Sequence, residues 1–586
     1  MSRSLGPIAV VTLVAMVACS SSSSPSGGGT GSGSDAGEGD GATTRQGDGG
    51  GSPGSDASTH PGEAGTPPPN VDGGSIPPPV AVCTAPISAA DVSHPTAVVG
   101  TGTAASCTEA ALTTALTAGG VVIFDCGAAP VTITVTQTIE LPTDKDTVLD
   151  GGGTVTMDGG GAVRILDWNG TNYRANTHTL TLQHVTLSRG HAVGTMMIAP
   201  APLPCSTGYY DGAGGALQMR DGVLHVIDAT FLNNEAEKLG PDVGGGAIYL
   251  NGGLLGVVVG STFVNNSGSN SGAIGSLNSD LDVYNSTFQG NAALGFGANS
   301  DDSTKCSVVD KNNQHQVGSG GNAGAVGMDG GSDGTHTFCG NVYRGNTSGT
   351  GALGGAMGRT PDAAMQTTVI DRCLFDSNIG DSAGALYFHN STLTITASTF
   401  TANVGLTGVG TIQADGTTFD FTNVTFIGNH AKAGVGATLA LFGGGGQLLN
   451  CTFADNVCDA ANQFGAAIFG SPTLTIQNTI FDADTAQNAG APMQCQVGTI
   501  TGSGDLQWPV NHASGGAADA LCAPGIYEGS DPLVGALGNH GGPVPVALVQ
   551  TGSPALGRGT NCPPTDARGN PRKATGCTSG AAEGTQ

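Results

Sequence analysis

Charged side chains, aromatic rings and basic residues are all scarce in this chain of 586 residues. Only 11% of the residues are charged and 5% are aromatic, and 18 Lys and Arg face 45 Asp and Glu, for a net charge of -27. A chain with 100 glycines and so few helix-favouring residues is not a helical bundle, and the missing Gly-x-y period excludes collagen. The acidic balance excludes nucleic acid and an anionic membrane surface as partners.

The common motifs of metal and nucleotide chemistry are also missing. The sequence has no Cys-x-x-Cys, no His-Glu-x-x-His and no Gly-Lys phosphate loop. It therefore indicates no metal site and no cofactor, although calcium stays open as a ligand of acidic loops. One apolar run, from Ile8 to Val17, is too short to span a bilayer and suits a signal peptide.

The N-terminus predicts export. Residues 1–18 are expected to be a signal peptide, and Met16-Val17-Ala18-Cys19 resembles the lipobox of bacterial lipoproteins. This resemblance implies cleavage before Cys19 and diacylation of its thiol, and Ser20 fits sorting to the outer membrane. Ordinary signal peptidase cleavage is the alternative. The expected location is the bacterial cell envelope, at the outer membrane or cell surface, with the lipid as the only membrane contact.

Residues 19–80 are predicted to be a disordered tether. Gly, Ser and Pro fill 38 of the 61 positions from 20 to 80, and Val71, Ile76 and Val80 are the only sizeable apolar residues there. Such a segment cannot bury enough surface to offset its ordering entropy.

A repeat fills the middle of the chain. An aromatic or leucine anchor follows an apolar residue by five positions and precedes an Asn by three. The ten anchors are Leu187, Phe231, Phe263, Phe288, Tyr343, Phe375, Phe400, Phe426, Phe453 and Phe481. Eight of them are followed by the asparagine, namely Asn234, Asn266, Asn291, Asn346, Asn378, Asn403, Asn429 and Asn456.

Short strands at this period, separated by turn residues, predict a solenoid. The expected fold is all-β, a right-handed single-stranded parallel β-helix of about twelve rungs over residues 131–485. The anchors would stack in the core, and the asparagines would form a hydrogen-bonded ladder at one turn.

Residues 81–130 are predicted to cap the first coil. Ser106 and Glu109 fit a capping box, followed by a short helix that ends at Gly119. A disulfide between Cys107 and Cys126 would fix this helix to the next strand. The spacing of the other cysteines suggests four further local pairs, Cys306–Cys339, Cys451–Cys458, Cys495–Cys522 and Cys562–Cys577.

Three family resemblances follow from these patterns. The Gly-Gly-Ala and Phe-x-x-Asn repeat from Gly214 to Asp484 resembles that of polymorphic outer-membrane proteins, and the whole body resembles the pectin-lyase-like β-helices. Residues 486–586, with DPLVGALGNHGGPVPVALVQTGSPALGRG at 531–559 and Asp566-Ala567-Arg568-Gly569, resemble the choice-of-anchor Q domain. The resemblance implies a cell-surface location without implying an activity.

The sequence contains no recognisable set of catalytic residues, so no catalytic residue is assigned. Asp301-Asp302 lacks the flanking motifs of polygalacturonase-like enzymes, and the outward strand positions are mostly threonine. The longest insertions fall at one point of the coil, where a binding face is usual. The candidate binding residues in these loops are His191, Tyr209, Tyr210, Asp211, Asp301, Asp302, Lys311 and His315.

Two functions from different classes fit the sequence. The favoured one is a non-catalytic surface lipoprotein that acts in adhesion, glycan binding or envelope structure, with a polysaccharide or a surface protein as ligand. The alternative is a surface-anchored polysaccharide lyase or glycoside hydrolase. An enzyme would show carboxylates and a basic residue converging on one face of the rungs.

Overall fold

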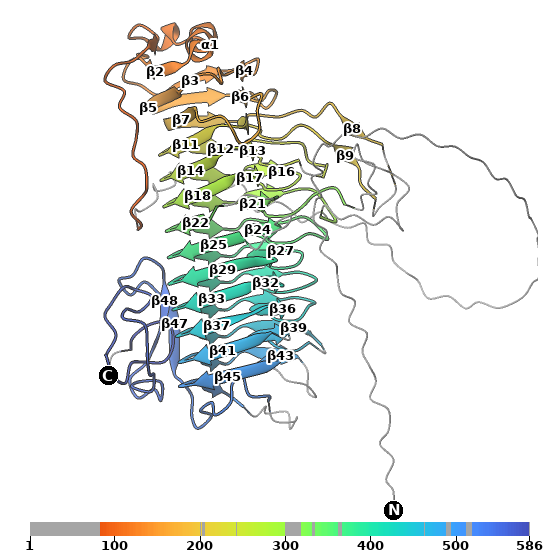
Figure 1. Ribbon diagram of the computed structural model, residues 1–586, viewed down its shortest axis with the longest axis vertical. Coiled ribbons are helices and arrows are strands. Elements are labelled where there is room, and N and C mark those ends of the chain that lie inside the picture. Colours follow the sequence, from red (N-terminus) through yellow and green to blue (C-terminus); the bar gives the residue numbers. More distant parts are fainter. Residues whose placement is uncertain are drawn as a thin grey trace, which may run out of the picture.

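The computed structural model describes residues 82–199, 201, 205–241, 243–298, 318–330, 334–360, 366–461, 463–470, 472–487, 494–510 and 519–584. Cys19, the tether, Asp301, Asp302, Lys311 and His315 lie outside these ranges. The described chain is a right-handed parallel β-helix, as the repeat predicted (Figure 1). In the described part of the chain, no helix is long and apolar enough to cross a membrane.

Most coils contribute one strand to a 12-stranded sheet B and two to a 25-stranded sheet A. Neighbouring strands pair in parallel and in register throughout the repeat, so equivalent residues of successive coils lie side by side. The strands of sheet B are β4 (Ile139–Glu140), β6 (Leu166–Asn169), β10 (Leu217–Arg220), β13 (Ile248–Asn251), β17 (Ile274–Leu277), β21 (Val326–Asp329), β24 (Met357–Thr360), β28 (Leu386–His389), β32 (Ile412–Asp415), β36 (Leu439–Phe442), β40 (Ile468–Gly470) and β44 (Cys495–Gln496).

In sheet A, two strands of one coil are separated by a bend. The strands before the bend are β11 (Val223–Ile227), β14 (Leu255–Val259), β18 (Asp280–Tyr284), β22 (His336–Cys339), β25 (Gln366–Asp371), β29 (Ser391–Thr396), β33 (Thr418–Thr422), β37 (Gly445–Leu449), β41 (Thr473–Gln477) and β45 (Thr499–Ser503). Those after it are β12 (Thr230–Leu232), β15 (Thr262–Val264), β19 (Thr287–Gln289), β23 (Val342–Arg344), β26 (Leu374–Asp376), β30 (Thr399–Thr401), β34 (Thr425–Ile427), β38 (Thr452–Ala454), β42 (Ile480–Asp482) and β46 (Leu506–Trp508). At the N-terminal end, β5 (Thr147–Asp158) and β7 (Thr179–Ser188) run through both positions, and β1 (Ala97–Val99), β2 (Gly120–Phe124) and β3 (Val131–Thr134) complete the sheet.

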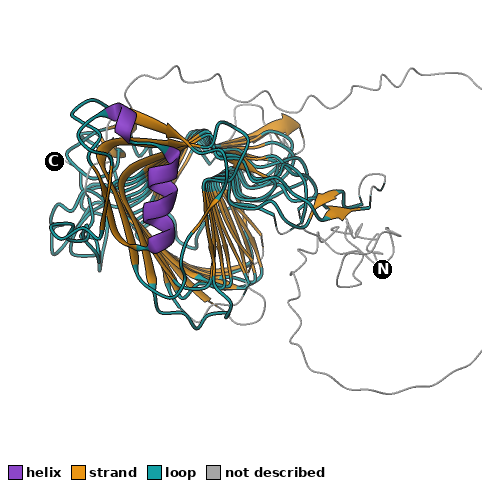
Figure 2. Cartoon of the chain, turned by 90° about the horizontal axis from the view of Figure 1, so that it is seen from above, coloured by secondary structure: helices purple, strands orange, loops and turns teal. Residues whose placement is uncertain are grey.

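Shorter strands follow the asparagine position and form sheet C. They are β16 (Ser267–Gly268), β20 (Ala292–Ala293), β27 (Ile379–Gly380), β31 (Val404–Gly405), β35 (His430–Ala431), β39 (Val457–Ala461) and β43 (Thr485–Gln487). Two antiparallel pairs lie outside the coils, β8 (Met197–Ile198) with β9 (Gly208–Tyr209) and β47 (Val534–Gly538) with β48 (Val546–Val549). Seen from above, the loops beyond sheet C project to one side of the rod (Figure 2).

The rung count from the sequence is correct for sheet B and too low for sheet A. Sheet B has twelve strands, whereas the ladder of sheet A passes through fourteen levels. The difference comes from β1 and β2, which belong to the predicted cap and yet pair with each other and with β5. The cap therefore contributes two strands of its own to sheet A.

Two stacks fill the interior beside the bend. Nine aromatic anchors, from Phe231 to Phe481, stack with ring centroids 4.6–5.1 Å apart. Next to them the eight asparagines are fully buried and form one continuous ladder. In Asn291, for example, the backbone nitrogen and Nδ2 both donate to Asn346 Oδ1 at 3.0 Å, and Nδ2 also donates to the Phe263 carbonyl.

A second polar ladder, which the sequence analysis missed, runs two residues before the anchors. Here a side-chain atom accepts a hydrogen bond from the backbone nitrogen of the preceding coil. Ser286 N donates to Asn341 Oδ1 at 2.8 Å, and Asn341 N donates to Cys373 Sγ at 3.4 Å. The residue types differ between coils, but each places an acceptor at the same buried site.

Turn residues in the left-handed region explain much of the glycine and asparagine content. In one coil Asn278 (φ 52°), Asn285 (φ 50°) and Gly290 (φ 64°) mark three successive corners. Glycine adopts this conformation without strain, and Asn tolerates it better than other residues. Part of the glycine and asparagine content therefore follows from corner geometry.

Both open ends of the rod are covered. Helix α1 (Glu109–Ala118) lies across the first coil and buries Leu112 and Leu116 (Figure 2). Its N-cap is Thr108, whose hydroxyl accepts from Ala111 N, so the expected capping box at Ser106 is wrong. At the other end the segment around Tyr527 pairs with Leu506, and Cys522 is bonded to Cys495.

The disulfides include one long-range pair. The structure joins Cys107 to Cys126, Cys495 to Cys522 and Cys562 to Cys577. The suggested pair Cys306–Cys339 is wrong, because Cys339 is bonded to Cys83, 256 residues away. The suggested pair Cys451–Cys458 is also wrong, since both are buried free thiols, as is Cys373. Cys373 and Cys451 both take part in the hydrogen bonds of the second ladder, so they have a structural role without a disulfide partner.

The first and the last described segments both pack on one edge of the rod, along the bend of sheet A (Figure 1). Residues 82–95, here called the strap, run antiparallel to the coil order, and residues 531–584, here called the C-terminal module, cover the later coils. In the strap, Val82 N and Cys83 N both donate to Asn285 Oδ1 at 2.8 Å. In the module, Thr560 and Thr578 accept from Asn478 and Asn450.

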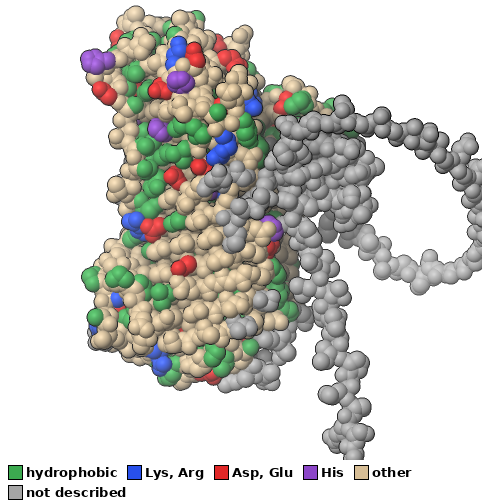
Figure 3. All heavy atoms as spheres, in the orientation of Figure 1, with side chains coloured by type: hydrophobic (Ala, Val, Ile, Leu, Met, Phe, Trp, Pro, Cys, Tyr) green, Lys and Arg blue, Asp and Glu red, His purple; other side chains and the backbone are tan. Residues whose placement is uncertain are grey.

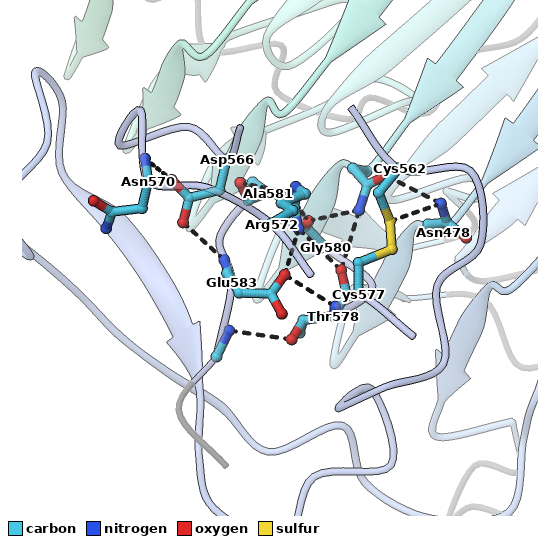
Figure 4. A network of polar contacts seen from close by, with 12 residues as sticks. Asn478, Cys562, Asp566, Asn570, Arg572, Cys577, Thr578, Gly580, Ala581 and Glu583 are labelled. Carbon is cyan, nitrogen blue, oxygen red and sulfur yellow. Dashed lines mark hydrogen bonds and ion pairs between the residues drawn. A yellow bond between two sulfur atoms is a disulfide. The ribbon is translucent and has the colours of Figure 1, made fainter. Parts of the chain in front are cut away.

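A buried ionic network holds the module together (Figure 4). Arg572 donates to Asn423 Oδ1 of the rod at 2.8 Å and to the carbonyls of Gly580 and Ala581. Its Nη1 also lies 3.3 Å from Glu583 Oε2. The C-terminal module, which contains the motif that resembles a choice-of-anchor Q domain, thus packs against the side of the β-helix.

Candidate functional site: a trough on sheet B

The outward face of sheet B carries the most distinctive surface of the rod. One column of outward residues crosses successive coils in exact parallel register. In order it contains Gln218, Tyr249, Gly275, Gly327, Gly358, Tyr387 and Gln413. Three consecutive glycines thus lie between two tyrosines, and the missing side chains leave a trough.

This trough has defined walls and a defined floor. It is a partly open hollow of about 60 Å³, with Gly275, Gly327 and Gly358 at its base. The Tyr249 ring leans over Gly275, since a Cβ at Gly275 would lie 2.9 Å from Tyr249 Cδ2. Tyr387 is buried and closes the opposite wall.

Polar groups border the trough on both sides. On one side Asn322 N donates to Asn270 Oδ1 at 2.9 Å, and Leu353 N donates to Asn322 Oδ1 at 3.1 Å. On the other side Thr360 Oγ1 donates to Asp329 Oδ1 at 2.7 Å. A partly buried tyrosine ring with amides, a hydroxyl and a carboxylate around it combines an apolar surface with a few polar groups, as small-molecule sites usually do.

A buried arginine lies on the same strands. Arg359 points into the core at the position that Met328 occupies in the preceding coil, and it is 2% exposed. Burial lowers its pKa to about 10, while Asp280 and Asp329 act in the opposite direction, so the guanidinium is charged at neutral pH. Its Nε and Nη2 have no hydrogen-bond partner within the described chain. Burial and the charge of Arg359 also lower the pKa of nearby His336 to about 3.

Two carboxyl groups lie side by side nearer the N-terminal end of this face. Glu140 and Asp167 are register partners on β4 and β6, so their Cα atoms are about 5 Å apart. Burial and the neighbouring Asp167 raise the pKa of Glu140, and burial raises that of Asp167. Arg164 Nη1 lies 3.8 Å from Asp167 Oδ2. A carboxyl group with a raised pKa is suited to act as a general acid.

A second charged cluster lies on sheet C. Asp459 accepts from Lys432 Nζ at 2.6 Å and lies 3.1 Å from His430 Nδ1. Although burial opposes it, these two contacts lower the pKa of Asp459. Both carboxylate oxygens are therefore occupied, and the cluster is an ion pair rather than an open site.

A hollow of about 450 Å³ separates the strap from the C-terminal module. Its charged residues are already paired, Arg372 with Asp371 and Arg568 with Asp566. Nearby, Cys83, Cys339 and Asp371 have the spacing of metal ligands, but the two sulfurs are bonded to each other. Neither arrangement offers an unoccupied set of ligand atoms.

The predicted loop residues lie apart from the trough. The backbone of His191 forms an isolated parallel β-bridge with that of Glu235, and the His191 ring Nδ1 is 3.2 Å from the Gly161 carbonyl. Asp211 accepts from Thr195 N and Oγ1 and from Met196 N, and these bonds lower its pKa against the effect of burial. Asp211 thus shapes the loop that carries β8 and β9. The remaining candidates, Asp301, Asp302, Lys311 and His315, lie outside the described residues.

Tyr209 and Tyr210 form part of the same loop. Tyr209 N donates to the Leu239 carbonyl at 2.9 Å, and Tyr210 N donates to the Met196 carbonyl at 2.9 Å. The tyrosines that line the trough, Tyr249 and Tyr387, were not among the candidates. Their signal in the sequence is their position one residue after the apolar residue that follows each Gly-Ala or Gly-Gly-Ala motif.

Comparison with known proteins adds little to this description. No family model and no curated protein matches the sequence. Among solved structures, PfbA, a surface adhesin of Streptococcus pneumoniae, aligns over 66% of this chain and 91% of that chain, with 13% identity and a TM-score of 0.31. These values are too low to transfer a function, and the fold assignment rests on the strand register alone.

Proposed function

We propose that this protein is a lipid-anchored bacterial surface β-helix that binds a polysaccharide in the trough of sheet B and acts in adhesion. The observation that carries the proposal is the run of three glycines between Tyr249 and Tyr387. The lipobox-like Cys19 and the Gly/Ser/Pro-rich tether support the surface location.

The trough suits a neutral, ring-shaped ligand. The apolar face of a sugar ring would lie on Tyr249, and its hydroxyls would replace water at Asn270, Asn322 and Thr360. A volume of about 60 Å³ takes only a ring substituent, so the polymer itself would lie along the surface. On the face of the rod that Figure 3 shows, charged side chains are few and scattered.

The second candidate function is hydrolysis or lyase cleavage of a surface polysaccharide. It is favoured by the Glu140–Asp167 pair, whose raised pKa values and neighbouring Arg164 would support proton transfer. The pair lies on the same column as the trough, with Gln218 between Asp167 and Tyr249. A polymer held in the trough would thus extend over the carboxyl groups.

Gly358→Thr tests binding without disturbing the fold. A Cβ at Gly358 would meet no atom closer than 3.7 Å, whereas one at Gly327 would lie 2.1 Å from Ser271 Oγ. The variant fills the trough, so retention on immobilised polysaccharides should fall at least tenfold for the full chain, with unchanged thermal stability. Thr475→Val, on the outward face of sheet A, is the matched control.

The same assay separates the two functions. Tyr249→Ala should weaken retention as Gly358→Thr does, without release of reducing or unsaturated ends. Equal retention by wild type and Gly358→Thr would disprove the trough as the binding site. Release of product that is lost in Asp167→Asn would establish the enzyme instead.

A further inference from the structure

We infer that the Cys83–Cys339 disulfide is a mechanical clamp that carries load from the N-terminal tether directly into the central coil of the trough. This inference rests on the proposed surface attachment through the tether. It concerns only the covalent path from the tether to the rod, so it can be tested without any ligand.

The covalent path is short. The tether continues into Val82 and Cys83, and Cys83 is bonded to Cys339 at the end of β22. Strand β21, which contains the trough residue Gly327, immediately precedes β22 in the same coil. A force that enters at Val82 therefore reaches the trough coil across one disulfide.

Without the disulfide, the load would pass through the strap. Hydrogen bonds hold the strap at two places on the rod. Asn285 bonds Val82 N, Cys83 N and the Cys83 carbonyl, each at 2.8 Å, and Gln183 bonds Ala90 N at 2.7 Å. Arg372 adds one bond of 3.2 Å to the Val82 carbonyl.

Such contacts would break one after another, because the strap lies along the rod and peels from one end. The load would next reach β1, which is a three-residue strand at the end of sheet A. The disulfide removes residues 84–338 from the load path, and these include the N-terminal cap and the first coils. The C-terminal module continues the same edge of the rod, and β8 and β9 lie on the opposite side (Figure 1).

The experiment is single-molecule force spectroscopy on the full chain. One handle is attached at the N-terminus, and the other at Thr350 through an unnatural amino acid. Thr350 is exposed and lies on the same coil as Cys339. With the disulfide intact, only the tether and a few residues lie between the handles, so the molecule should stretch without unfolding steps.

The double variant Cys83→Ser/Cys339→Ser should instead lengthen in steps at low force. The released length approaches roughly 900 Å for 256 residues, less what the remaining disulfides hold back. Cys495→Ser/Cys522→Ser is the matched control and should behave as wild type, because that pair lies beyond the second handle.

Reduction of the mounted wild-type molecule provides a second measurement that needs no altered residue. It should release the length seen in the double variant together with the length that other disulfides between the handles, such as Cys107–Cys126, hold back in that variant. The inference is overturned if unreduced wild type releases the same length as the double variant, or if the double variant shows no added length. Loss of polysaccharide binding alone would refute the proposed function and leave the clamp intact.

Discussion

Asn456 donates two hydrogen bonds to a single oxygen of Asp484, at 3.0 Å from its backbone nitrogen and 2.7 Å from Nδ2. Asp484 thus occupies the ladder position that asparagine fills in the preceding coils. Its other oxygen, Oδ2, is buried without a hydrogen-bond partner in the described structure. Burial raises the pKa of Asp484 well above its ordinary value, because the charged carboxylate is disfavoured away from water.

Asp484→Asn should therefore stabilise the protein at neutral pH. The new Nδ2 could donate to the Phe453 carbonyl, as Asn456 Nδ2 donates to that of Phe426. Giving a buried polar atom its partner is worth about 1–3 kcal/mol. Thermal unfolding followed by circular dichroism at pH 7 should show a higher midpoint, and an unchanged or lower midpoint would contradict the ladder assignment.

The pH dependence of stability provides a separate prediction for Asp484. The native carboxyl holds a proton that the unfolded chain releases above about pH 4. The stability that this group contributes is fully present below pH 4 and is lost as pH rises through the native pKa. Asp484→Asn should flatten the decline in stability above pH 4. Asp482 and Asp505, whose pKa values burial raises to about 7 and about 8, should contribute to the remaining slope, and Asp505→Asn should reduce it further.

The repeat could be predicted because its signals are chemically uniform. Phe263, Phe288 and Phe400 stack on equivalent atoms, so each coil requires an aromatic or large apolar residue at the same position. The second ladder escaped notice because Ser286, Asn341 and Cys373 share only an acceptor atom. Pattern searches detect similar side chains more easily than similar hydrogen bonds.

The candidate site was harder to predict than the fold. Loops of different length separate each asparagine from the next strand of sheet B, so the register of Tyr249, Gly275 and Gly327 is clear only after strand pairing is known. Glycine is common at the corners of such a chain. The glycines at the base of the trough therefore cannot be distinguished from corner glycines in the sequence. Cys83 and Cys339 are 256 residues apart, and nothing in their local sequence connects them.

The three free thiols of the described residues should be unreactive in the folded protein. Burial raises the pKa values of Cys373, Cys451 and Cys458 to about 12, so the thiolate is not populated at neutral pH. A thiol reagent should label all three only after denaturation, as measured by mass spectrometry of the labelled peptides. Rapid labelling of native Cys451 or Cys458 would show that the C-terminal coils open.

Cys373 offers a test of the second ladder. Cys373→Ser keeps an acceptor for Asn341 N, as Ser398 does for Cys373 N, and should change stability little. Cys373→Val removes the acceptor and should cost about 1–3 kcal/mol. Equal thermal midpoints for the two variants would show that the contact at 3.4 Å contributes nothing.

Arg359→Met should raise or preserve stability. The variant copies Met328 of the preceding coil and removes a buried charge whose Nε and Nη2 make no hydrogen bond in the described structure. Thermal unfolding at pH 7 checks this, with Arg344→Met on the surface as control. A fall in the midpoint would show that Arg359 compensates the charge of Asp280, and Asp280→Asn should then restore it.

Arg572→Lys should release the C-terminal module from the rod. The guanidinium reaches Asn423, Gly580 and Ala581 at once, and a lysine ammonium cannot reproduce this planar fork. Limited proteolysis should therefore cut within residues 531–584, while the β-helix stays intact by circular dichroism. Lys573→Met, at the exposed neighbouring position, is the control and should leave the module resistant. If Arg572→Lys stays equally resistant, the contacts of Asn450 and Asn478 with the module suffice to hold it, and the double variant Asn450→Ala/Asn478→Ala should then release it.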